Sequence, residues 1–330
     1  MQVFHGPEAY EAGAHPVVTI GTFDGVHLGH QSILNRIVKE AQKSEGESVL
    51  VTFEPHPRLV LFPENNPLRL LQTLDEKIAT LDRLGIDKML VMPFTKAFSR
   101  TPSKRFIHDI LVKTTQARQI IIGYDHRFGK NRTGGLEELR QYKDEFRYQV
   151  AEIPAQAIDS ANVSSTKIRK SLNAGDINMA NRYLGYPYSL GGRVVEGAKL
   201  GRTLGYPTAN LDTGFPHKLV PAHGVYLVRV WEESPSSGGN SSQRKGDFHY
   251  GLMSIGTNPT VGENLPRTTE VFIYDFEGDL YGKWLRVDFL EFLRPQIDFK
   301  GDMDALRRAM NGDSERGRDL FQKFPHPSNA

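Results

Sequence analysis

Gly21-Thr22-Phe23-Asp24-Gly25-Val26-His27-Leu28-Gly29-His30 is the stretch that decides how the first half of this chain folds. The apolar run from Pro16 to Ile20 leads into it, and an amphipathic segment begins near Leu28. This order predicts a strand, a glycine-rich turn and the N-terminus of a helix. Such a turn forms a site for a polyphosphate, because backbone N–H groups and the helix dipole point at the anion.

Two histidines in this stretch are candidates for contact with that anion. His27 and His30 are three residues apart, so both imidazoles face one side of the first helical turn. Two donors that can each carry positive charge near neutral pH suit a triphosphate whose charge shifts during reaction. A histidine pair at this spacing is otherwise an ordinary surface feature. The preceding Gly21, Asp24 and Gly25 favour the phosphate site.

Length and composition set limits on the fold and on the partners. A chain of 330 residues exceeds what one compact core usually holds, so we expect two domains. The formal charge of +2 gives no strong global field. We therefore expect neither nucleic acid nor a membrane as a partner, and small molecules instead.

Cysteine usage and the N-terminal segment indicate the compartment. The chain has no cysteine, which excludes disulfides, thiolate metal sites and a cysteine nucleophile. Met1 to Tyr10 lacks the pattern of a signal peptide, and the apolar runs are far too short to span a membrane. We expect a cytoplasmic protein.

Short β-branched runs alternate with amphipathic segments through the first half of the chain. The expected strands are Pro16–Ile20, Ser48–Glu54, Lys88–Phe94, Arg118–Gly123 and Tyr148–Ile153, and the expected helices are Leu28–Lys43, Thr73–Leu84, Pro102–Lys113 and Gly135–Glu145. This alternation predicts an α/β domain in which helices cover both faces of a parallel sheet. Ligands bind beyond the carboxyl ends of the strands in such sheets.

The second half follows a different period. Alternating runs appear from Arg193 onward, at Gly224–Glu232, Phe248–Ile255, Glu270–Phe276 and Trp284–Leu293. Period-two alternation with frequent turns predicts an all-β antiparallel barrel or sandwich. We expect a mobile hairpin loop at 234–246, a helix at Asp302–Met310 and a domain boundary near residue 185. The domains are then 1–185 and 186–330.

Three further segments of the first half are open to two interpretations. Glu54-Pro55-His56-Pro57 is either a proline-stiffened turn or a binding loop. The segment from Gly123 to Lys130, which includes Asp125 and Phe128, is a solvated loop or a ligand contact. Its place beside the predicted phosphate site favours ligand contact. Val163–Arg169 begins a helix that its serines can cap, whereas Arg169 adds a bidentate phosphate clamp.

Pro207-Thr208-Ala209-Asn210 is the corresponding signal in the second half. Proline fixes the backbone, and the Thr208 hydroxyl and Asn210 amide point the same way on an extended chain. Both are oxygen ligands that suit Mg²⁺. Glycines flank the segment at Gly192–Gly197 and Gly201–Gly205, and these glycines alone also fit an ordinary turn.

The motifs of the first half resemble a known superfamily. His27-Leu28-Gly29-His30 and Ser164-Ser165-Thr166-Lys167-Ile168-Arg169 resemble the paired motifs of nucleotidyltransferases. The sequence of Gly21–His30 is similar to that of the FMN adenylyltransferase half of bacterial bifunctional riboflavin kinase/FAD synthetases. That resemblance implies a Rossmann-like domain that transfers AMP from ATP to FMN, giving FAD and pyrophosphate.

The resemblance also implies roles for individual residues. His27 and His30 hold the ATP phosphates and stabilise the leaving pyrophosphate. The other implied contacts with ATP are Gly21, Phe23, Asp24, Gly29, Ser164, Thr166 and Arg169. Asp125 and Phe128 lie at the flavin or the nucleotide.

The second half resembles riboflavin kinases. Pro207–Asn210 matches their PTAN motif, and Gly224–Tyr226 and Gly256–Thr260 match neighbouring segments. The resemblance implies a six-stranded barrel in which Thr208 and Asn210 bind Mg²⁺–ATP, beside Gly197, Gly205 and Pro207. It also implies that Glu270 is the catalytic base, because the hydroxyl of riboflavin must lose a proton.

Two other functions and the assembly state stay open. Another small-molecule adenylyltransferase shares the first pair of motifs, but the PTAN-bearing half argues against it. A flavin-binding regulator is disfavoured because His27, His30, Thr208, Asn210 and Glu270 are all present. A homo-oligomer is compatible with everything in the sequence.

Overall fold

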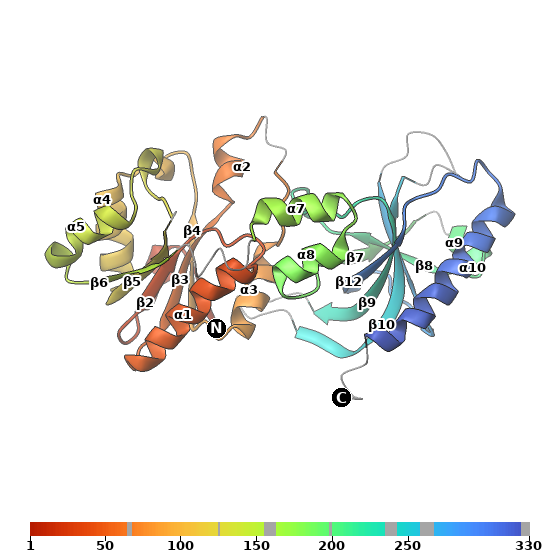
Figure 1. Cartoon of the computed structure of the whole chain (residues 1–330), viewed down its shortest axis with the longest axis horizontal. Helices are drawn as coiled ribbons and strands as arrows, with labels where there is room; N and C mark the ends of the chain where they lie inside the picture. The colour runs from red at the N-terminus through yellow and green to blue at the C-terminus, as the bar shows by residue number, and fades with distance from the viewer. Residues whose placement is uncertain are drawn as a thin grey trace. The chain divides into compact units, whose positions relative to one another are not determined.

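The computed structural model describes residues 1–64, 68–124, 126–154, 163–197, 200–234, 243–257 and 267–324 (Figure 1). The chain divides into two compact units, Met1–Ser165 and a second made of Thr166–Pro235 with Ser242–Ala330. Contacts therefore group residues 166–185 with the second unit, whereas the sequence pattern predicts a boundary near residue 185. As a functional boundary, residue 185 stays a prediction.

A six-stranded parallel sheet forms the centre of the first unit. Its strands are β1 (Gln2–His5), β2 (Val17–Ile20), β3 (Ser48–Glu54), β4 (Lys88–Pro93), β5 (Gln119–Gly123) and β6 (Gln149–Ile153). The strand order is β1-β4-β3-β2-β5-β6, so the chain adds strands on one side of β2 and then returns to the other. The crevice for ligands in such a sheet lies at this switch point, where the loop after β2 begins.

Helices cover both faces of this sheet, which confirms the predicted class. The longer ones are α1 (Leu28–Lys43), α3 (Leu74–Arg83), α4 (Ser103–Phe106) with the π-helical segment η3 (Ile107–Thr114), and α5 (Leu136–Phe146). Leu34 of α1 and Leu81 of α3 pack with Leu50 on one face. Ile107 of η3 and Leu139 of α5 pack on the other face.

Local sequence explains where these helices begin and end. A capping box begins α3, because Thr73 Oγ1 accepts from the Glu76 N–H and the Glu76 carboxylate accepts from the Thr73 N–H. The helix predicted at Pro102–Lys113 becomes a short α-helix that continues as a π-helix. Shorter helices are η1 (Pro7–Ala9), α2 (Pro57–Leu61), η2 (Phe98–Arg100) and η4 (Lys130–Arg132).

The second unit contains a closed antiparallel barrel, which resolves the open choice between barrel and sandwich. Its strands are β7 (Ser189–Val195), β8 (Thr208–Asp212), β9 (Gly224–Ser234), β10 (Gln243–Gly256), β11 (Thr268–Ile273) and β12 (Trp284–Arg294). The order around the barrel is β10-β11-β8-β7-β12-β9. Gln243 pairs with Ser234, so β9 and β10 form the expected hairpin, although most of the loop predicted at its tip lies outside the described residues.

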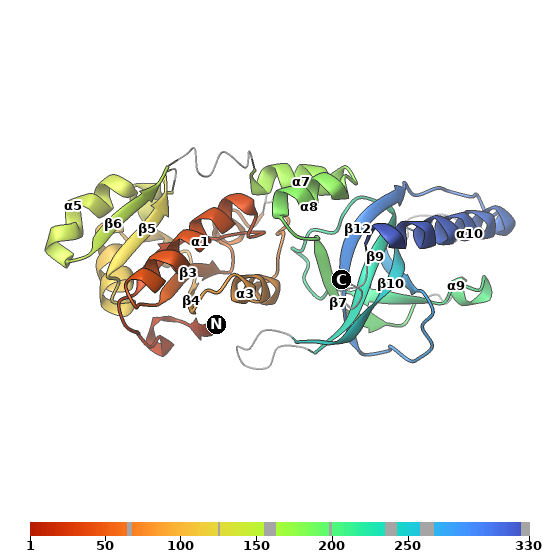
Figure 2. The same cartoon turned by 60° about the horizontal axis from the view of Figure 1, so that its bottom comes forward.

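Helices surround the barrel in this unit. They are α7 (Ser165–Asn173), α8 (Ile177–Leu184), α9 (Leu200–Thr203), α10 (Met303–Leu320) and η5 (Phe321–Lys323). Figure 2 shows α10 lying along the barrel, where Leu320 packs with Leu227 and Leu252 of the strands. The predicted helix at Asp302–Met310 is therefore real but longer, and it covers an apolar strip of the barrel exterior.

Candidate active sites

The loop after β2 has an unusual backbone. Gly25 has a φ of 87°, and two residues with side chains, Phe23 and Val26, have φ of 45° and 33°. Left-handed backbone costs glycine little but is rare for a β-branched residue such as valine. A Cβ at Gly21 would lie 2.7 Å from the Phe23 ring, so glycine is required there. The surrounding structure must hold this loop in place.

Side chains from three segments hold the loop by its carbonyl groups. The hydrogen bonds join Lys77 Nζ to the Thr22 carbonyl (2.7 Å), Ser165 Oγ to the Asp24 carbonyl (2.9 Å) and Gln31 Nε2 to the Val26 carbonyl (2.8 Å). Side chains therefore anchor the carbonyl of every second residue from Thr22 to Val26. A polyphosphate is repelled by carbonyl oxygens, so anchoring them suits an anion site.

Asp24 serves this loop as a support. Its side chain is 4% exposed, and Oδ1 accepts from the backbone N–H groups of Leu71 and Gln72 at 2.9 and 3.3 Å. The carboxylate thus ties the loop to the segment before α3. A direct role of Asp24 in ATP binding stays a prediction.

The two histidines lie together at the start of α1. Their rings stack with centroids 3.6 Å apart and an interplanar angle of 15°. His27 is the N-cap, and its Nδ1 accepts from the His30 N–H at 3.3 Å, so the neutral His27 ring carries its proton on Nε2. The Phe23 ring lies 5.0 Å from that of His30. The structure therefore brings together the pair that the sequence singled out.

The surroundings of His30 determine its charge. Burial, the neighbouring His27 and the ammonium of Lys77 together lower the pKa of His30 well below 6.5. His30 is therefore neutral near pH 7 in the free protein. Burial also lowers the pKa of Lys77, but Asp24 and Glu54 oppose that shift and favour the ammonium form.

Lys77 is the residue of this site that sequence reasoning missed. A lysine in an amphipathic helix is expected on the solvated face, yet Lys77 is 6% exposed. The sequence around Lys77 contains no motif that would mark it as a site residue. Only the fold shows that α3 directs it at the loop.

The remaining residues predicted at the first site are dispersed. Gly29 is buried in the first turn of α1, and Ser164 lies just before α7. Thr166 and Arg169 lie on α7 and belong to the second unit. Their contacts with ATP stay predictions.

The predicted flavin loop gives a mixed result. Asp125 lies outside the described residues. Phe128 is buried, lies 5.4 Å from the Phe106 ring and pairs with Gly134 through two backbone hydrogen bonds. Phe128 is thus a core residue in this structure, and its contact with a ligand stays a prediction.

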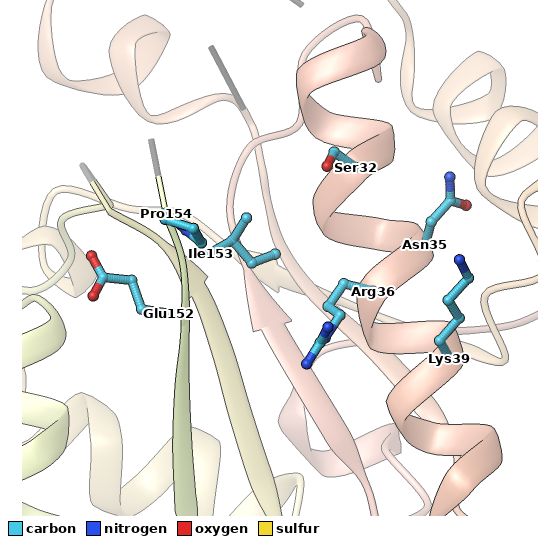
Figure 3. A pocket seen from close by; sticks show the side chains of 7 residues that line it. All are labelled: Ser32, Asn35, Arg36, Lys39, Glu152, Ile153 and Pro154. Carbon is cyan, nitrogen blue, oxygen red and sulfur yellow. The ribbon is translucent and has the colours of Figure 1, made fainter. Parts of the chain in front are cut away.

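A cavity of about 600 Å³ lies between α1 and the end of β6 (Figure 3). Its walls are Ser32, Asn35, Arg36, Lys39, Glu152, Ile153 and Pro154. It opens beside the helix that carries the histidines, but neither histidine lines it. The polar walls mix cationic side chains with one carboxylate.

The second unit brings its three predicted residues together on adjacent strands. Thr208 Oγ1 donates to Glu270 Oε2 at 3.0 Å. Asn210 is paired directly with Glu270 across the antiparallel strands β8 and β11. Directly opposite residues project from the same face of a sheet, so Thr208, Asn210 and Glu270 share one face. These three residues are close enough to contact one nucleotide and its acceptor.

Glycines and Tyr206 shape the approach to this face. A Cβ at Gly197 would collide with the Asn210 amide, and Gly205 has a φ of 86°. Tyr206 packs edge-on against Phe272 at 5.1 Å, and its hydroxyl donates to Asn311 Oδ1 of α10 at 2.7 Å. The long α10 therefore holds the residue that precedes Pro207.

The donor set of this face fits a hard cation. Thr208 and Asn210 supply neutral oxygens and Glu270 a carboxylate, which is the chemistry that Mg²⁺ prefers. Among the residues that the structure describes, no cluster of three His, Cys, Asp or Glu could hold a metal alone. A cation here would therefore depend on the phosphates of its nucleotide for further ligands.

Comparison with known proteins gives a family match for each half of the chain. The FAD synthetase family model matches residues 10–167, and the riboflavin kinase model matches residues 184–321. A bifunctional riboflavin kinase/FMN adenylyltransferase of Listeria monocytogenes is 33% identical, with 93% of each chain covered. The enzyme of the same name from Pseudomonas fluorescens is 36% identical, with 94% of each chain covered.

A solved structure has the same fold over nearly the whole chain. It is described as a macrolide-efflux protein from Streptococcus pneumoniae, with a TM-score of 0.80 and 29% identity, and the match covers 96% of this chain and 99% of that one. In the part of this chain that the structure describes, no helix has the length and apolar character to cross a bilayer. The two family matches follow the order of the two units, and the relatives match over more than nine tenths of their length. This chain therefore belongs to the family of bifunctional riboflavin kinase/FMN adenylyltransferases.

Proposed function

We propose that this chain makes FAD from riboflavin in two steps, one in each unit. The second unit phosphorylates riboflavin with ATP, giving FMN and ADP. The first unit then transfers AMP from a second ATP to FMN, giving FAD and pyrophosphate. The observation that carries the proposal is the hydrogen bond from Thr208 to Glu270 opposite Asn210, since it supplies a base beside candidate cation ligands.

In the kinase step Glu270 acts on a neutral alcohol. Its carboxylate takes the proton of the riboflavin hydroxyl while that oxygen bonds to the γ-phosphorus and the bond to ADP breaks. A positioned general base contributes about 10²–10⁴-fold to such a rate. The Thr208 hydroxyl orients the carboxylate.

Thr208 and Asn210 are the residues that would hold Mg²⁺ with ATP in this unit, beside Gly197, Gly205 and Pro207. When bound, the cation neutralises phosphate charge. Tyr206, held by Asn311, keeps the PTAN segment in its extended shape against β11.

In the adenylyl step the acceptor is already an anion. A phosphate oxygen of FMN bonds to the α-phosphorus of ATP, and the bond to pyrophosphate breaks. No base is needed, so catalysis consists of positioning and charge stabilisation. His27 and His30 meet this need as stacked donors at a helix N-terminus, with Ser164, Thr166 and Arg169 as further proposed contacts.

Two alternatives are distinguished by their products. A regulator would bind flavin without changing it, and an adenylyltransferase for another substrate would not phosphorylate riboflavin. The cytoplasmic location, the homo-oligomer and the absence of nucleic-acid and membrane partners stay predictions.

One assay tests the proposal directly. The full chain is incubated with riboflavin, ATP and Mg²⁺, and the flavins are separated by chromatography. FMN should appear first and FAD second, with ADP and pyrophosphate as co-products. Bound but unaltered flavin would contradict the proposal and support the regulator.

A further inference from the structure

Lys77 is a buried cation whose neighbouring carboxylates, Asp24 and Glu54, do not form a salt bridge with it. Within the described part of the chain it forms no salt bridge, and its ammonium donates one hydrogen bond, to the Thr22 carbonyl at 2.7 Å. A buried charge is costly unless it is paired and fully hydrogen-bonded. An unpaired buried ammonium therefore needs an explanation.

Lys88 provides an internal contrast in the same unit. It is as buried as Lys77, at 6% exposure. Its ammonium forms a salt bridge with Glu47 at 2.8 Å and a hydrogen bond to the Glu11 carbonyl at 3.0 Å. Lys88 thus has the direct partners expected of a structural lysine, whereas the direct hydrogen bond of Lys77 goes to the loop carbonyl and its carboxylate neighbours act at longer range.

The surroundings of Lys77 belong to the histidine site. Its charge reaches His30, whose pKa it helps to lower, and Asp24 and Glu54 are the carboxylates that stabilise its ammonium form. His30 Nδ1 is itself buried without a hydrogen-bond partner. A ring nitrogen without a hydrogen-bond partner and an ammonium outside any salt bridge are therefore two groups of one site that an additional polar group could satisfy.

We propose that Lys77 is a positioning residue of the adenylyl-transfer site, which fixes the Thr22–Val26 loop through the Thr22 carbonyl and places a positive charge beside it for the ATP phosphates. This inference rests on the proposed function of the first unit. It assigns to Lys77 the positive charge that His30 lacks. As pyrophosphate leaves, negative charge grows, and a fixed cation stabilises that state more than the bound substrate.

The test compares Lys77→Met with Lys88→Met in the full chain. Both variants remove a buried ammonium and keep a similar side-chain length. Lys77→Met should lower the kcat of FMN adenylylation at least about 30-fold, as expected for loss of one charge-stabilising group. It should change the KM for ATP much less. Riboflavin phosphorylation should stay within about two-fold of wild type, because its residues lie in the other unit. Lys88→Met should lower the urea midpoint but keep kcat.

A binding measurement separates charge from structure. The probe is inorganic pyrophosphate, titrated by calorimetry into the wild type, both methionine variants and Lys77→Arg. Lys77→Met should bind it at least about ten-fold more weakly, the effect of one charged hydrogen bond. Lys77→Arg, which keeps the charge, should bind within about three-fold of wild type even where its kcat is lower.

Several outcomes would overturn the inference. These are an unchanged kcat in Lys77→Met, an equal loss of adenylylation in both methionine variants, or equal pyrophosphate affinity in all four proteins. A wild type that forms no FAD yet binds pyrophosphate through Lys77 would refute the proposed function and leave Lys77 as the cation of an anion site. Should Lys77→Met fail to fold, Lys77→Arg decides, since loss of its pyrophosphate affinity contradicts a role of charge.

Discussion

The histidine site of the first unit is made from a loop, whereas the Thr208–Glu270 site of the second is made from two paired strands. In the loop, left-handed residues are held by side chains from distant segments, and burial keeps the pKa of His30 well below its usual range. On the strands, ladder pairing alone sets Asn210 opposite Glu270. The geometry of the first site thus depends on many tertiary contacts, and that of the second on the pairing register of β8 and β11.

The difference follows the chemistry that each site is proposed to perform. An anionic acceptor needs no proton removed, so its site can consist of donors and a cation. A neutral alcohol needs a base at a fixed distance, and adjacent strands fix such distances with little freedom. The predictions below test whether the two sites are as independent and as differently built as this comparison states.

The largest effect is expected from Glu270→Gln. This change keeps the shape and the partner Thr208 but removes the base, so riboflavin phosphorylation should fall about 10²–10⁴-fold. FMN adenylylation should be unaffected. Separate assays with riboflavin and with FMN as substrates measure the two rates. A comparable loss of both activities in a folded variant would contradict the two-site description.

His30→Ala should give the reciprocal result with a smaller effect. Removing one stabilising donor should lower pyrophosphate release from FMN and ATP about 10²-fold, while riboflavin phosphorylation continues. The matched control is His108→Ala, because His108 lies in the same unit and its exposed imidazole contacts the carboxylate of Asp109. If His108→Ala lost as much adenylylation as His30→Ala, the histidine site would not be the seat of that activity.

The smallest effect concerns the pH dependence of stability. The pKa of His30 is lowered in the folded protein from its ordinary 6.5, so the unfolded chain takes up the proton first as pH falls. The free energy of unfolding should therefore decrease below about pH 6.5, by up to about 1.4 kcal/mol per pH unit, and not change above it for this reason. His30→Phe should lack this component.

Urea unfolding at pH 7.5 and 5.5 measures it. Circular dichroism should follow the transition, since Trp231 and Trp284 both lie in the barrel and their fluorescence reports that unit alone. Glu54, whose pKa is raised by burial, acts in the opposite sense in both proteins and cancels in the comparison. An identical pH dependence for wild type and His30→Phe would show that His30 is not buried in neutral form.

Sequence pattern predicted most of the architecture because the strands of the first sheet are continuous apolar runs. β1 was missed, since Gln2–His5 is only four residues long, half exposed, and stabilised by its pairing with β4. The sandwich alternative could not be excluded, because closure of a barrel depends on which strands pair and not on their periodicity.

The sites were predicted unequally for a related reason. Residues carried by short motifs, such as His27, His30, Thr208 and Asn210, were recognised, and the structure brings each pair together. Lys77 lies about 50 residues from the loop it holds, so no local pattern shows the contact. Burial of Phe128 could not be predicted either, because its packing against Phe106 joins segments about 20 residues apart, and its contact with a ligand stays a prediction.

Because the barrel is closed, the two units differ in the strand edges that they present to other molecules. Each of the six strands pairs with two neighbours in the described part of the barrel, so the barrel does not end in an edge strand there. The sheet of the first unit instead ends at β1 and β6, each of which pairs with one neighbouring strand. Edge strands are where pairing between copies of a chain can start, so the parallel sheet carries a hazard that the closed barrel avoids.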